Sequence, residues 1–241
     1  MSLPVYRRVL VKLSGEALAG GRGFGLDPET LKRICAELAA LAGSGVQTAV
    51  VIGGGNFFRG VSAAAAGWDR VAADHIGMLA TVINALALRQ TLEAAGAPAC
   101  VLSALPVAGV VEPYTQERAL GLLDQGRIVI FAAGTGNPFF STDTAASLRA
   151  AEIGAQLLLK ATKVDGVYDA DPLREPNARR YDRLTYDAVL QQRLGVMDAT
   201  AIALCREHNI PLRVFAMDHP GILCRIAAGA EEGTLIYDEQ P

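Results

Sequence analysis

The sequence predicts an α/β fold, a three-layer α/β/α sandwich around a mostly parallel central sheet. Short apolar runs rich in β-branched residues alternate with longer helical patterns along the 241 residues, as in parallel sheets that helices cover on both faces. Three of these runs end in polar, glycine-rich loops. Because the carboxyl ends of parallel strands meet at one edge of a sheet, the three loops are predicted to line a single crevice large enough for a nucleotide.

Seven segments have the composition of buried strands. Their residues are mostly Val, Ile, Leu and Ala in nearly continuous runs, which is typical of strands covered on both faces. The predicted strands lie near residues 6–13, 47–53, 99–103, 127–132, 156–161, 211–216 and 234–237.

The segments between these strands have helical spacing. Asp27 followed by Pro28 is a strong helix start, with an N-cap carboxylate and a proline at the first helical position. A longer helix is predicted over 69–93, closed by Gly96 and Pro98. The apolar side chains expected on the core face of the first long helix are Leu31, Ile34, Leu38 and Leu41. Shorter helices are predicted over 115–124, 142–154, 185–193, 198–208 and 220–228.

Composition restricts the class of protein. A hydrophobic content of 51% with 20% charged residues is typical of a compact globular chain. The net charge of −3 gives no general reason to expect nucleic acid or an anionic membrane as a partner. No apolar run reaches the length needed to span a bilayer, and the first residues, MSLPVYRRVL, lack an apolar signal core. A cytoplasmic protein is therefore expected.

Several common kinds of site are not indicated. The cysteines have no CxxC pair and are interpreted as buried or partly buried thiols, and the histidines lack metal-ligand spacing, so no direct metal ligand is assigned. These residues are Cys35, Cys100, Cys205, Cys224, His75, His208 and His219. The sequence also lacks GxxxxGK[ST], GxGxxG after a strand, GxSxG and HExxH. With these kinds of site excluded, the sequence still allows a phosphate-binding site that does not use a Walker motif.

Candidate phosphate-binding groups follow the first two strands. Lys12 ends the first strand just before Ser14 and Gly15, where its ammonium could reach a phosphate, although a lysine there could also simply extend to water. Residues 53–55, all glycine, could wrap phosphates with main-chain N–H groups. Arg59 would add a guanidinium that grips phosphate oxygens in pairs, whereas the triple glycine alone could be only a tight turn.

The third loop, from Gly134 to Asp143, is the most informative stretch. Its glycines let the backbone turn sharply and approach a ligand, and Asn137, Ser141 and Thr142 offer short hydrogen-bonding groups. Asp143 lies where the next helix would begin, the position at which strand–loop–helix units bind small anions. A loop of this kind can also be rich in glycine for geometry alone.

Three further side chains could recognise a nucleoside. Asp74 interrupts an apolar helix and could accept hydrogen bonds from a ribose diol, although a solvated helix residue is the commoner case. Tyr168 could lie against a base and Asp171 could bind a ribose or an amino group. The same segment also makes sense as an Asp-Gly turn followed by an Asp-Pro turn.

Taken together, these motifs resemble the amino-acid-kinase superfamily, and within it the branch of bacterial uridylate (UMP) kinases. KLSGE and GGG occur across the superfamily, whereas GTGNPFF together with DHIGMLAT and VMDATA points to the UMP-using branch. The matching segments cover nearly the whole chain: VLVKLSGE at 9–16, VIGGGNFFRG at 51–60, ADHIGMLATVINALALR at 73–89, AAGTGNPFFSTDTAA at 132–146, KATKVDGVYDADP at 160–172, LTYDAVL at 184–190, VMDATAIALC at 196–205 and PLRVFAMDHPG at 211–221.

The resemblance implies transfer of the γ-phosphoryl group of ATP to UMP, giving UDP and ADP with Mg²⁺ as cofactor, in pyrimidine nucleotide (CTP) biosynthesis. It implies catalytic roles for Lys12, Arg59 and Asp143. It places ATP on Lys12, Leu13, Ser14, Gly15, Gly55, Arg59, Thr162, Tyr168 and Asp171. It places UMP on Gly54, Asp74, Thr135, Gly136, Asn137, Pro138, Phe139, Phe140, Ser141 and Thr142.

The resemblance also implies a domain organisation, an assembly and regulation. A single domain over residues 1–241 would carry the UMP site in its N-terminal part, about 1–155, and the ATP nucleoside site in its C-terminal part, about 156–241. A homohexamer is implied, with inhibition by UTP at the UMP pocket. A segment linked to activation by GTP is matched by Gly20, Gly21, Arg22, Gly23, Phe24 and Gly25. The stretch 90–100 is poor in the basic and histidine residues that a further triphosphate site needs, which counts against this activation.

Two other hypotheses remain open. The first is a kinase of the same fold for a carboxylate substrate such as acetylglutamate, which the GTGNPFF loop and Asp74 disfavour because they suit a nucleotide. The second is a regulatory protein that binds nucleotides without turnover. It is disfavoured because Lys12, Arg59 and Asp143 are present together.

Overall fold

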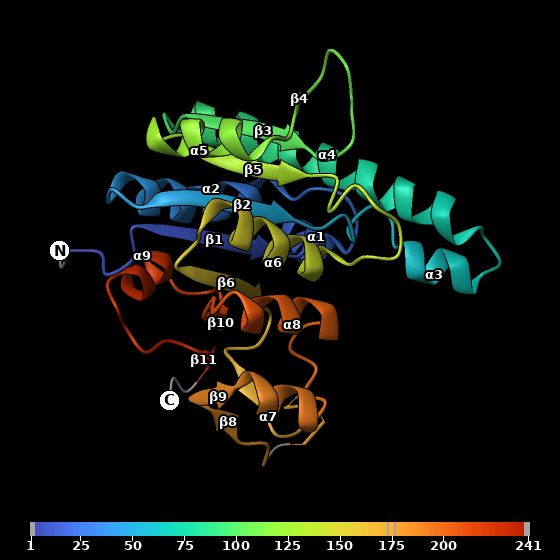
Figure 1. Cartoon of the computed structure of the whole chain (residues 1–241). Coiled ribbons are helices and arrows are strands. Elements are labelled where there is room, and N and C mark those ends of the chain that lie inside the picture. Colours follow the sequence, from blue (N-terminus) through green and yellow to red (C-terminus); the bar gives the residue numbers. More distant parts are fainter. Residues whose placement is uncertain (1–2, 173, 176, 239–241) are drawn as a thin grey trace.

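A nine-stranded sheet forms the middle layer of the computed structural model, which describes residues 3–172, 174–175 and 177–238 (Figure 1). The strand order is β4-β3-β5-β2-β1-β6-β10-β11-β9. Among the described strands of this sheet, only β10 and β11 pair antiparallel, so the predicted mostly parallel α/β/α sandwich is confirmed. The strands are β1 Arg8–Leu13, β2 Gln47–Ile52, β3 Ala99–Ser103, β4 Glu112–Pro113, β5 Ile128–Ala132, β6 Leu157–Thr162, β9 Arg183–Thr185, β10 Leu212–Ala216 and β11 Thr234–Tyr237.

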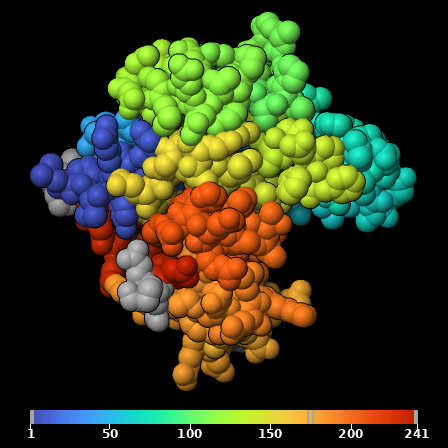
Figure 2. All heavy atoms as spheres, viewed as in Figure 1, coloured from blue at the N-terminus to red at the C-terminus, as the bar shows by residue number. Residues whose placement is uncertain are grey.

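Helices cover both faces of the sheet. α2, α4 and α9 share a core with one face, and α5, α6, α7 and α8 pack on the other. The helices are α1 Gly15–Leu18, α2 Pro28–Gly43, α3 Gly60–Ala65, α4 Arg70–Ala94, α5 Gln116–Asp124, α6 Thr142–Ile153, α7 Tyr186–Gln191, α8 Ala199–Glu207 and α9 Ile222–Ala227, with a 3₁₀ turn at Gly20–Arg22. Figure 2 shows that the end where α3 meets α4 projects from the body of the molecule.

The predicted helix starts are confirmed by their caps. Asp27 accepts a hydrogen bond of 2.9 Å from the N–H of Thr30, with Pro28 at the first helical position. Asp69 caps α4 in the same way, and Ser141 caps α6. The predicted core side chains of α2 are all buried against the sheet, and all four cysteines are free thiols that are buried or partly buried.

Several short elements were not predicted. α1, α3, β4 and β9 are too short to show a period in the sequence. In the irregular stretch 162–184, a small antiparallel ladder joins β7 Val167–Tyr168 to β8 Arg180–Tyr181. Two of these additions matter for the site, because α1 carries Gly15 and Glu16 and α3 begins directly after Arg59.

One expectation about membrane segments was wrong. Among the described helices, α4 is long and apolar enough to cross a membrane by length and composition, with a mean hydropathy of 1.6. About 44% of its most apolar stretch is buried inside the protein, because one side packs on β3 and β5. The helices of a protein core pass the same test of length and hydropathy.

Candidate active site

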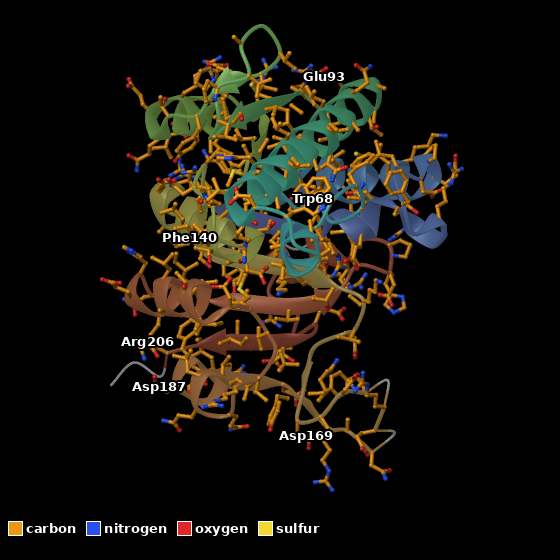
Figure 3. The ribbon with its side chains drawn as sticks, turned by 90° about the vertical axis from the view of Figure 1, so that its right-hand side faces the viewer. Trp68, Glu93, Phe140, Asp169, Asp187 and Arg206 are labelled. Atoms are coloured by element: carbon orange, nitrogen blue, oxygen red, sulfur yellow. The ribbon has the colours of Figure 1, made fainter. Side chains whose placement is uncertain are left out.

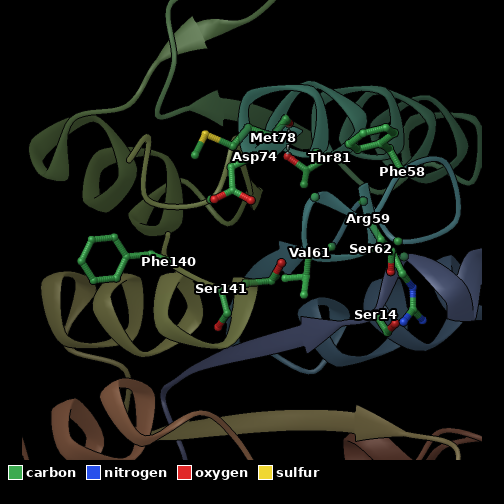
Figure 4. Close-up of a pocket in the computed structure, with 18 of the residues that line it drawn as sticks. Ser14, Phe58, Arg59, Val61, Ser62, Asp74, Met78, Thr81, Phe140 and Ser141 are labelled. Carbon is green, nitrogen blue, oxygen red and sulfur yellow. Dashed lines mark hydrogen bonds between the residues drawn. The ribbon is translucent and has the colours of Figure 1, made fainter. Parts of the chain in front are cut away.

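The three glycine-rich loops meet at the carboxyl edge of the sheet and enclose a cavity of about 480 Å³. Figure 4 shows side chains of α4 on one side, including Asp74 and Thr81, with Ser141 at the start of α6 and Ser14 after β1 opposite them. The predicted site residues that line this first cavity are Lys12, Ser14, Gly15, Gly54, Gly55, Arg59, Asp74, Thr135, Phe139, Phe140, Ser141 and Thr142. The predicted single crevice is thus present.

Two more cavities continue from the first along the same edge. The second, about 550 Å³, shares Lys12, Ser14 and Glu16 with the first cavity. It also takes in predicted Leu13 and Gly20. The third, about 600 Å³, shares Lys160 and Thr162 with the second and contains Tyr168 and Asp171. The predicted ATP and UMP residues, apart from Gly136, Asn137 and Pro138, therefore line one connected series of cavities.

A buried charged cluster lies at the junction of these cavities. The ammonium of Lys12 is 2.8 Å from Oδ1 of Asp143, and the ammonium of Lys160 is 2.8 Å from Oδ2. Burial acts to raise the pKa of Asp143, but the two ammonium groups outweigh it and hold that pKa below its ordinary value. Burial lowers the pKa of Lys160, although the attraction of Asp143 acts to raise it. Asp143 is therefore a carboxylate near neutral pH.

Arg59 is held beside this cluster by Glu16. The guanidinium of Arg59 is in contact with Oε1 of Glu16, and Lys163 lies 3.6 Å from Oε2. The side chain of Arg59 is 58% exposed, so it can turn toward a ligand without breaking a packed core. An incoming phosphate would compete with Glu16 for this guanidinium.

Asp74 organises the opposite wall of the first cavity. Its Oδ2 accepts a hydrogen bond of 2.7 Å from the N–H of Phe139 and another of 2.8 Å from Nε of Arg70. Its Oδ1 faces Gly60, where an added Cβ would lie only 2.4 Å away. Asp74 is therefore a largely buried carboxylate at the ligand cavity and not a solvated helix residue, since only 12% of its side chain is exposed.

The glycines of the first two loops allow a very close approach of backbone segments. A Cβ on Gly15 would lie 2.6 Å from the carbonyl of Gly53, and one on Gly54 would lie 2.6 Å from the carbonyl of Gly77 in α4. Any side chain at these positions would push the loops apart. The glycine at 54 is thus required by the contact with α4.

A buried amide pair fixes the second loop. Asn56 and Asn84 exchange hydrogen bonds of 3.0 and 2.7 Å through their side chains. Asn84 also donates to the carbonyl of Gly53, at 2.7 Å. Asn56 donates to the carbonyl of Gly25, at 2.8 Å, and its own carbonyl accepts from the N–H of Gly25. The predicted allosteric segment 20–25 is therefore joined to the second glycine-rich loop.

Some predicted residues lie outside the first cavity. Gly136, Asn137 and Pro138 are not among the residues lining it, and Asn137 instead bonds within the loop to Thr135. Of the segment 20–25, Gly20 alone lines one of the three cavities described above. Asp143 lines none of the three cavities, but it is paired with Lys12 and follows Thr142 in the chain, and both of these residues line the first cavity.

Several charged residues of the site were not predicted. They include Glu16 and Arg70, which line the first cavity, Lys160, and Asp198, which caps α8 and accepts hydrogen bonds from Ser141 and Thr144. Lys160 had a detectable signal, since it is the one charged residue in an otherwise apolar strand, as Lys12 nearly is in its own. The in-register pairing that brings these two lysines together is not visible in the sequence.

Comparison with known proteins agrees with this geometry. The model of the amino acid kinase family matches residues 7–216. The chain is 58% identical over 236 residues to the uridylate kinase of Ectopseudomonas mendocina, covering 98% of this chain and 96% of that protein. It is also 58% identical over 235 residues to the uridylate kinase of Pseudomonas aeruginosa strain PAO1, with the same coverage.

Solved structures give the same result. The crystal structure of UMP kinase from Bacillus anthracis has a TM-score of 0.94 at 43% identity, covering 98% of this chain and 97% of that one. That of UMP kinase from Ureaplasma parvum has a TM-score of 0.90 at 36% identity, covering 96% of this chain and 99% of the other. The chain belongs to the amino acid kinase family.

Proposed function

We propose that the chain is a uridylate kinase, which transfers the γ-phosphoryl group of ATP to UMP and releases UDP and ADP. One observation carries this proposal: the cavity formed by the glycine-rich loops and the cavity that continues toward Thr162 meet at Lys12 and Ser14. A donor and an acceptor held in these cavities would present their phosphates to the same lysine. Relatives named uridylate kinase, aligned along nearly the entire chain, support the choice of substrate.

The chemistry requires positioning more than proton transfer. The acceptor is itself a phosphate that is largely ionised near neutral pH, so no general base is needed. The work of the protein is to align two anions and to offset their repulsion. Lys12 supplies a charge fixed by Asp143, and Arg59 supplies an exposed charge that can follow the phosphates. Main-chain N–H groups of residues 54–55 and the helix start at Ser14 would complete an anion-binding surface, whereas the N–H of Gly53 already donates to the carbonyl of Leu13.

The residues fit a magnesium ion that arrives on the nucleotide. Within the described parts of the chain, no group of three or more acidic, histidine or cysteine side chains converges on one point. Magnesium in kinases is commonly held by phosphates and water with one or two carboxylates. Asp143 is the carboxylate of this chain that would face its hydration shell. The ion would neutralise phosphate charge.

We propose that the two parts of the chain bind different substrates. The N-terminal part, about 1–155, would bind UMP through Gly54, Asp74 and the loop 135–142. The C-terminal part, about 156–241, would bind the ATP nucleoside through Thr162, Tyr168 and Asp171, which line the third cavity. Both substrates are cytoplasmic metabolites, and we place the enzyme there.

ADP release from Mg-ATP tests the proposal with UMP, CMP, dTMP, AMP and acetylglutamate as parallel acceptors. Rapid turnover with UMP alone is the expected result. Turnover with acetylglutamate in place of UMP would favour a carboxylate kinase. Binding of UMP or UTP without ADP release would favour a regulatory protein, and either result would overturn the proposal.

We also propose that the chain assembles into a homohexamer. α4 exposes apolar side chains at helical spacing on the side away from the sheet, and Figure 3 shows this helix across the front of the molecule between Trp68 and Glu93. The exposed large apolar residues on α4 and on the segment just before it are Val61, Trp68, Val71, Ile76, Leu79 and Ile83. A continuous exposed apolar stripe is typical of a protein contact. Light scattering tests this, since Leu79→Glu with Ile83→Glu should reduce the mass of the assembly.

Regulation by nucleotides follows from the same site. UTP would inhibit by occupying the UMP cavity, so its inhibition should be competitive with UMP. GTP would activate through the segment 20–25, whose Gly25 is bonded to Asn56. Initial rates with and without each triphosphate test both statements. GTP activation that survives Phe24→Ala and Arg22→Ala together would exclude the segment.

A further inference from the structure

We propose that Asn84 is a positioning residue for phosphate binding, which acts with Asn56 on the carbonyl of Gly53 to aim main-chain N–H groups at the phosphates. This inference rests on the proposed function. It concerns two buried amides that lie outside the predicted site. Asn84 lies on the buried side of α4, and Asn56 directly follows the three glycines of the second loop.

The two amides use all of their N–H groups inside the protein. Each side-chain amide has two N–H donors. Those of Asn84 go to the carbonyl of Gly53 and to Oδ1 of Asn56, both at 2.7 Å. Those of Asn56 go to the carbonyl of Gly25, at 2.8 Å, and to Oδ1 of Asn84, at 3.0 Å. Turning either amide over would set its oxygen against a carbonyl oxygen, so the orientation of both side chains is fixed.

Two carbonyls of the second glycine-rich loop are held by these and neighbouring donors. That of Gly53 accepts from Asn84. That of Gly54 accepts from the N–H groups of residues 57–58, each at 3.0 Å. The C=O and the N–H of a trans peptide point in opposite directions, so these contacts turn the N–H groups of Gly54 and Gly55 the other way. Among the described residues, neither N–H has an acceptor, and both glycines line the first cavity, where they can bind an anion.

The first glycine-rich loop packs against the same pair. A Cβ on Gly15 would lie 2.6 Å from Oδ1 of Asn56 and 2.7 Å from the main-chain nitrogen of Gly55. Asn56 and Asn84 are 1 and 0% exposed, so water has no access to replace a lost partner. Without the amide of Asn84, the carbonyl of Gly53 would lose its donor and the peptide that follows it could turn over. A turned peptide would present an oxygen to the phosphate in place of an N–H group.

A comparison of UMP with uridine tests the inference on the full-length protein. Both ligands have the same base and ribose, but only UMP carries a phosphate. Asn84→Ala should raise the Kd for UMP by roughly 10-fold and leave that for uridine within about 3-fold, since the loss corresponds to one hydrogen bond to a charged group. Isothermal titration measures UMP, and competition against UMP measures uridine. Thr91→Ala, which removes a hydrogen bond within α4, is the matched control and should change neither Kd.

A double-mutant cycle tests whether the two amides act as one unit. Asn56→Ala alone should weaken UMP about as much as Asn84→Ala does, again with little change for uridine. Adding it to Asn84→Ala should raise the Kd for UMP by less than about a further 3-fold, because members of one hydrogen-bond network are not additive.

Equal weakening of UMP and uridine would overturn the inference, because it would mean that the pair only maintains the shape of the cavity. An unchanged Kd for UMP, or full additivity of the two substitutions, would overturn it as well. If Asn84→Ala does not fold, as judged by circular dichroism, Asn84→Ser enters the same comparison and the ratio of the two Kd values decides. A wild-type protein that binds neither UMP nor uridine would refute the proposed function instead.

Discussion

The main-chain N–H of Phe139 donates a hydrogen bond of 2.7 Å to Oδ2 of Asp74, which joins the third glycine-rich loop to α4. The same oxygen accepts from Arg70, whose guanidinium lies over the ring of Phe139 at 5.5 Å. The carboxylate proposed to hold the UMP ribose therefore already shapes the loop that would enclose uridine. Under the proposed function, substrate binding and loop conformation would both depend on this one side chain.

Asp74→Asn should weaken UMP binding more than turnover. The substitution removes the charge that both Arg70 and the N–H of Phe139 bind, and hydrogen bonds to charged groups contribute about 1.5–3 kcal/mol. We expect KM for UMP to rise by roughly 10- to 100-fold, with kcat within a few-fold. Steady-state kinetics measure this, and Asp187→Asn at an exposed ion pair is the control. An unchanged KM would remove Asp74 from the UMP site.

Lys12→Met should abolish most turnover and spare acceptor binding. Removing one preorganised charge at the site of developing charge commonly costs about 100- to 1,000-fold in kcat. Isothermal titration should show a Kd for UMP within about 3-fold of the wild type, since the ribose and uridine contacts remain. Turnover like that of the wild type would show that the lysine has no part in the reaction.

Gly54→Ala should separate α4 from the phosphate loop. The new Cβ would lie 2.6 Å from the carbonyl of Gly77 and 2.9 Å from Cβ of Ala80, so one backbone segment must move. Overpacking of this kind costs about 1–3 kcal/mol. KM for UMP should rise because Gly77 lines the first cavity and Ala80 lies on the same helix, α4. Urea unfolding and kinetics measure the two effects. Gly121→Ala, in a helix with open space around it, should be neutral or stabilising by up to about 1 kcal/mol.

Asp143 should stabilise the fold in a pH-dependent manner. Its folded pKa lies below the ordinary value, because the two lysines outweigh the effect of burial. Such a carboxyl stabilises the fold fully above its unfolded pKa of about 3.9, and this stabilisation is lost as the pH falls through the lower folded pKa.

The comparison of wild type with Asp143→Asn by urea unfolding measures this effect. The difference in unfolding free energy should be constant between about pH 7 and 5 and should shrink as the pH is lowered toward about 3. A difference that grows on acidification would mean that the carboxyl is stabilised in its protonated form.

Local patterns in the sequence predicted the strands and the helix starts correctly. Features that depend on contacts between segments distant in the sequence were missed. The seven apolar strands and the helix starts at Asp27, Asp69 and Ser141 were correct, since composition and caps are local signals. α3 was missed because six small residues carry no period. Lys160 was missed for a different reason: its role comes from the register of β6 against β1, which the sequence of neither strand contains.

The candidate site was likewise predictable only in part. Glycine-rich loops after strands indicate a crevice, and the family resemblance assigned residues within it. The ion pair of Glu16 with Arg59 and the amide pair of Asn56 with Asn84 could not be predicted, because they join segments whose spacing only the fold sets. The exposed apolar side of α4 also became recognisable only when its other side was seen on the sheet.

The continuity of the three cavities along one edge has a consequence for inhibitor design. Lys12 and Ser14 belong to the walls of the first and second cavities, and Lys160 and Thr162 to those of the second and third. A single molecule in which uridine and adenosine are joined by a chain of phosphates could occupy all three cavities. Its two ends would be anchored together, so the binding of one raises the local concentration of the other. Varying the number of phosphates in such a series would measure the distance between the two nucleosides.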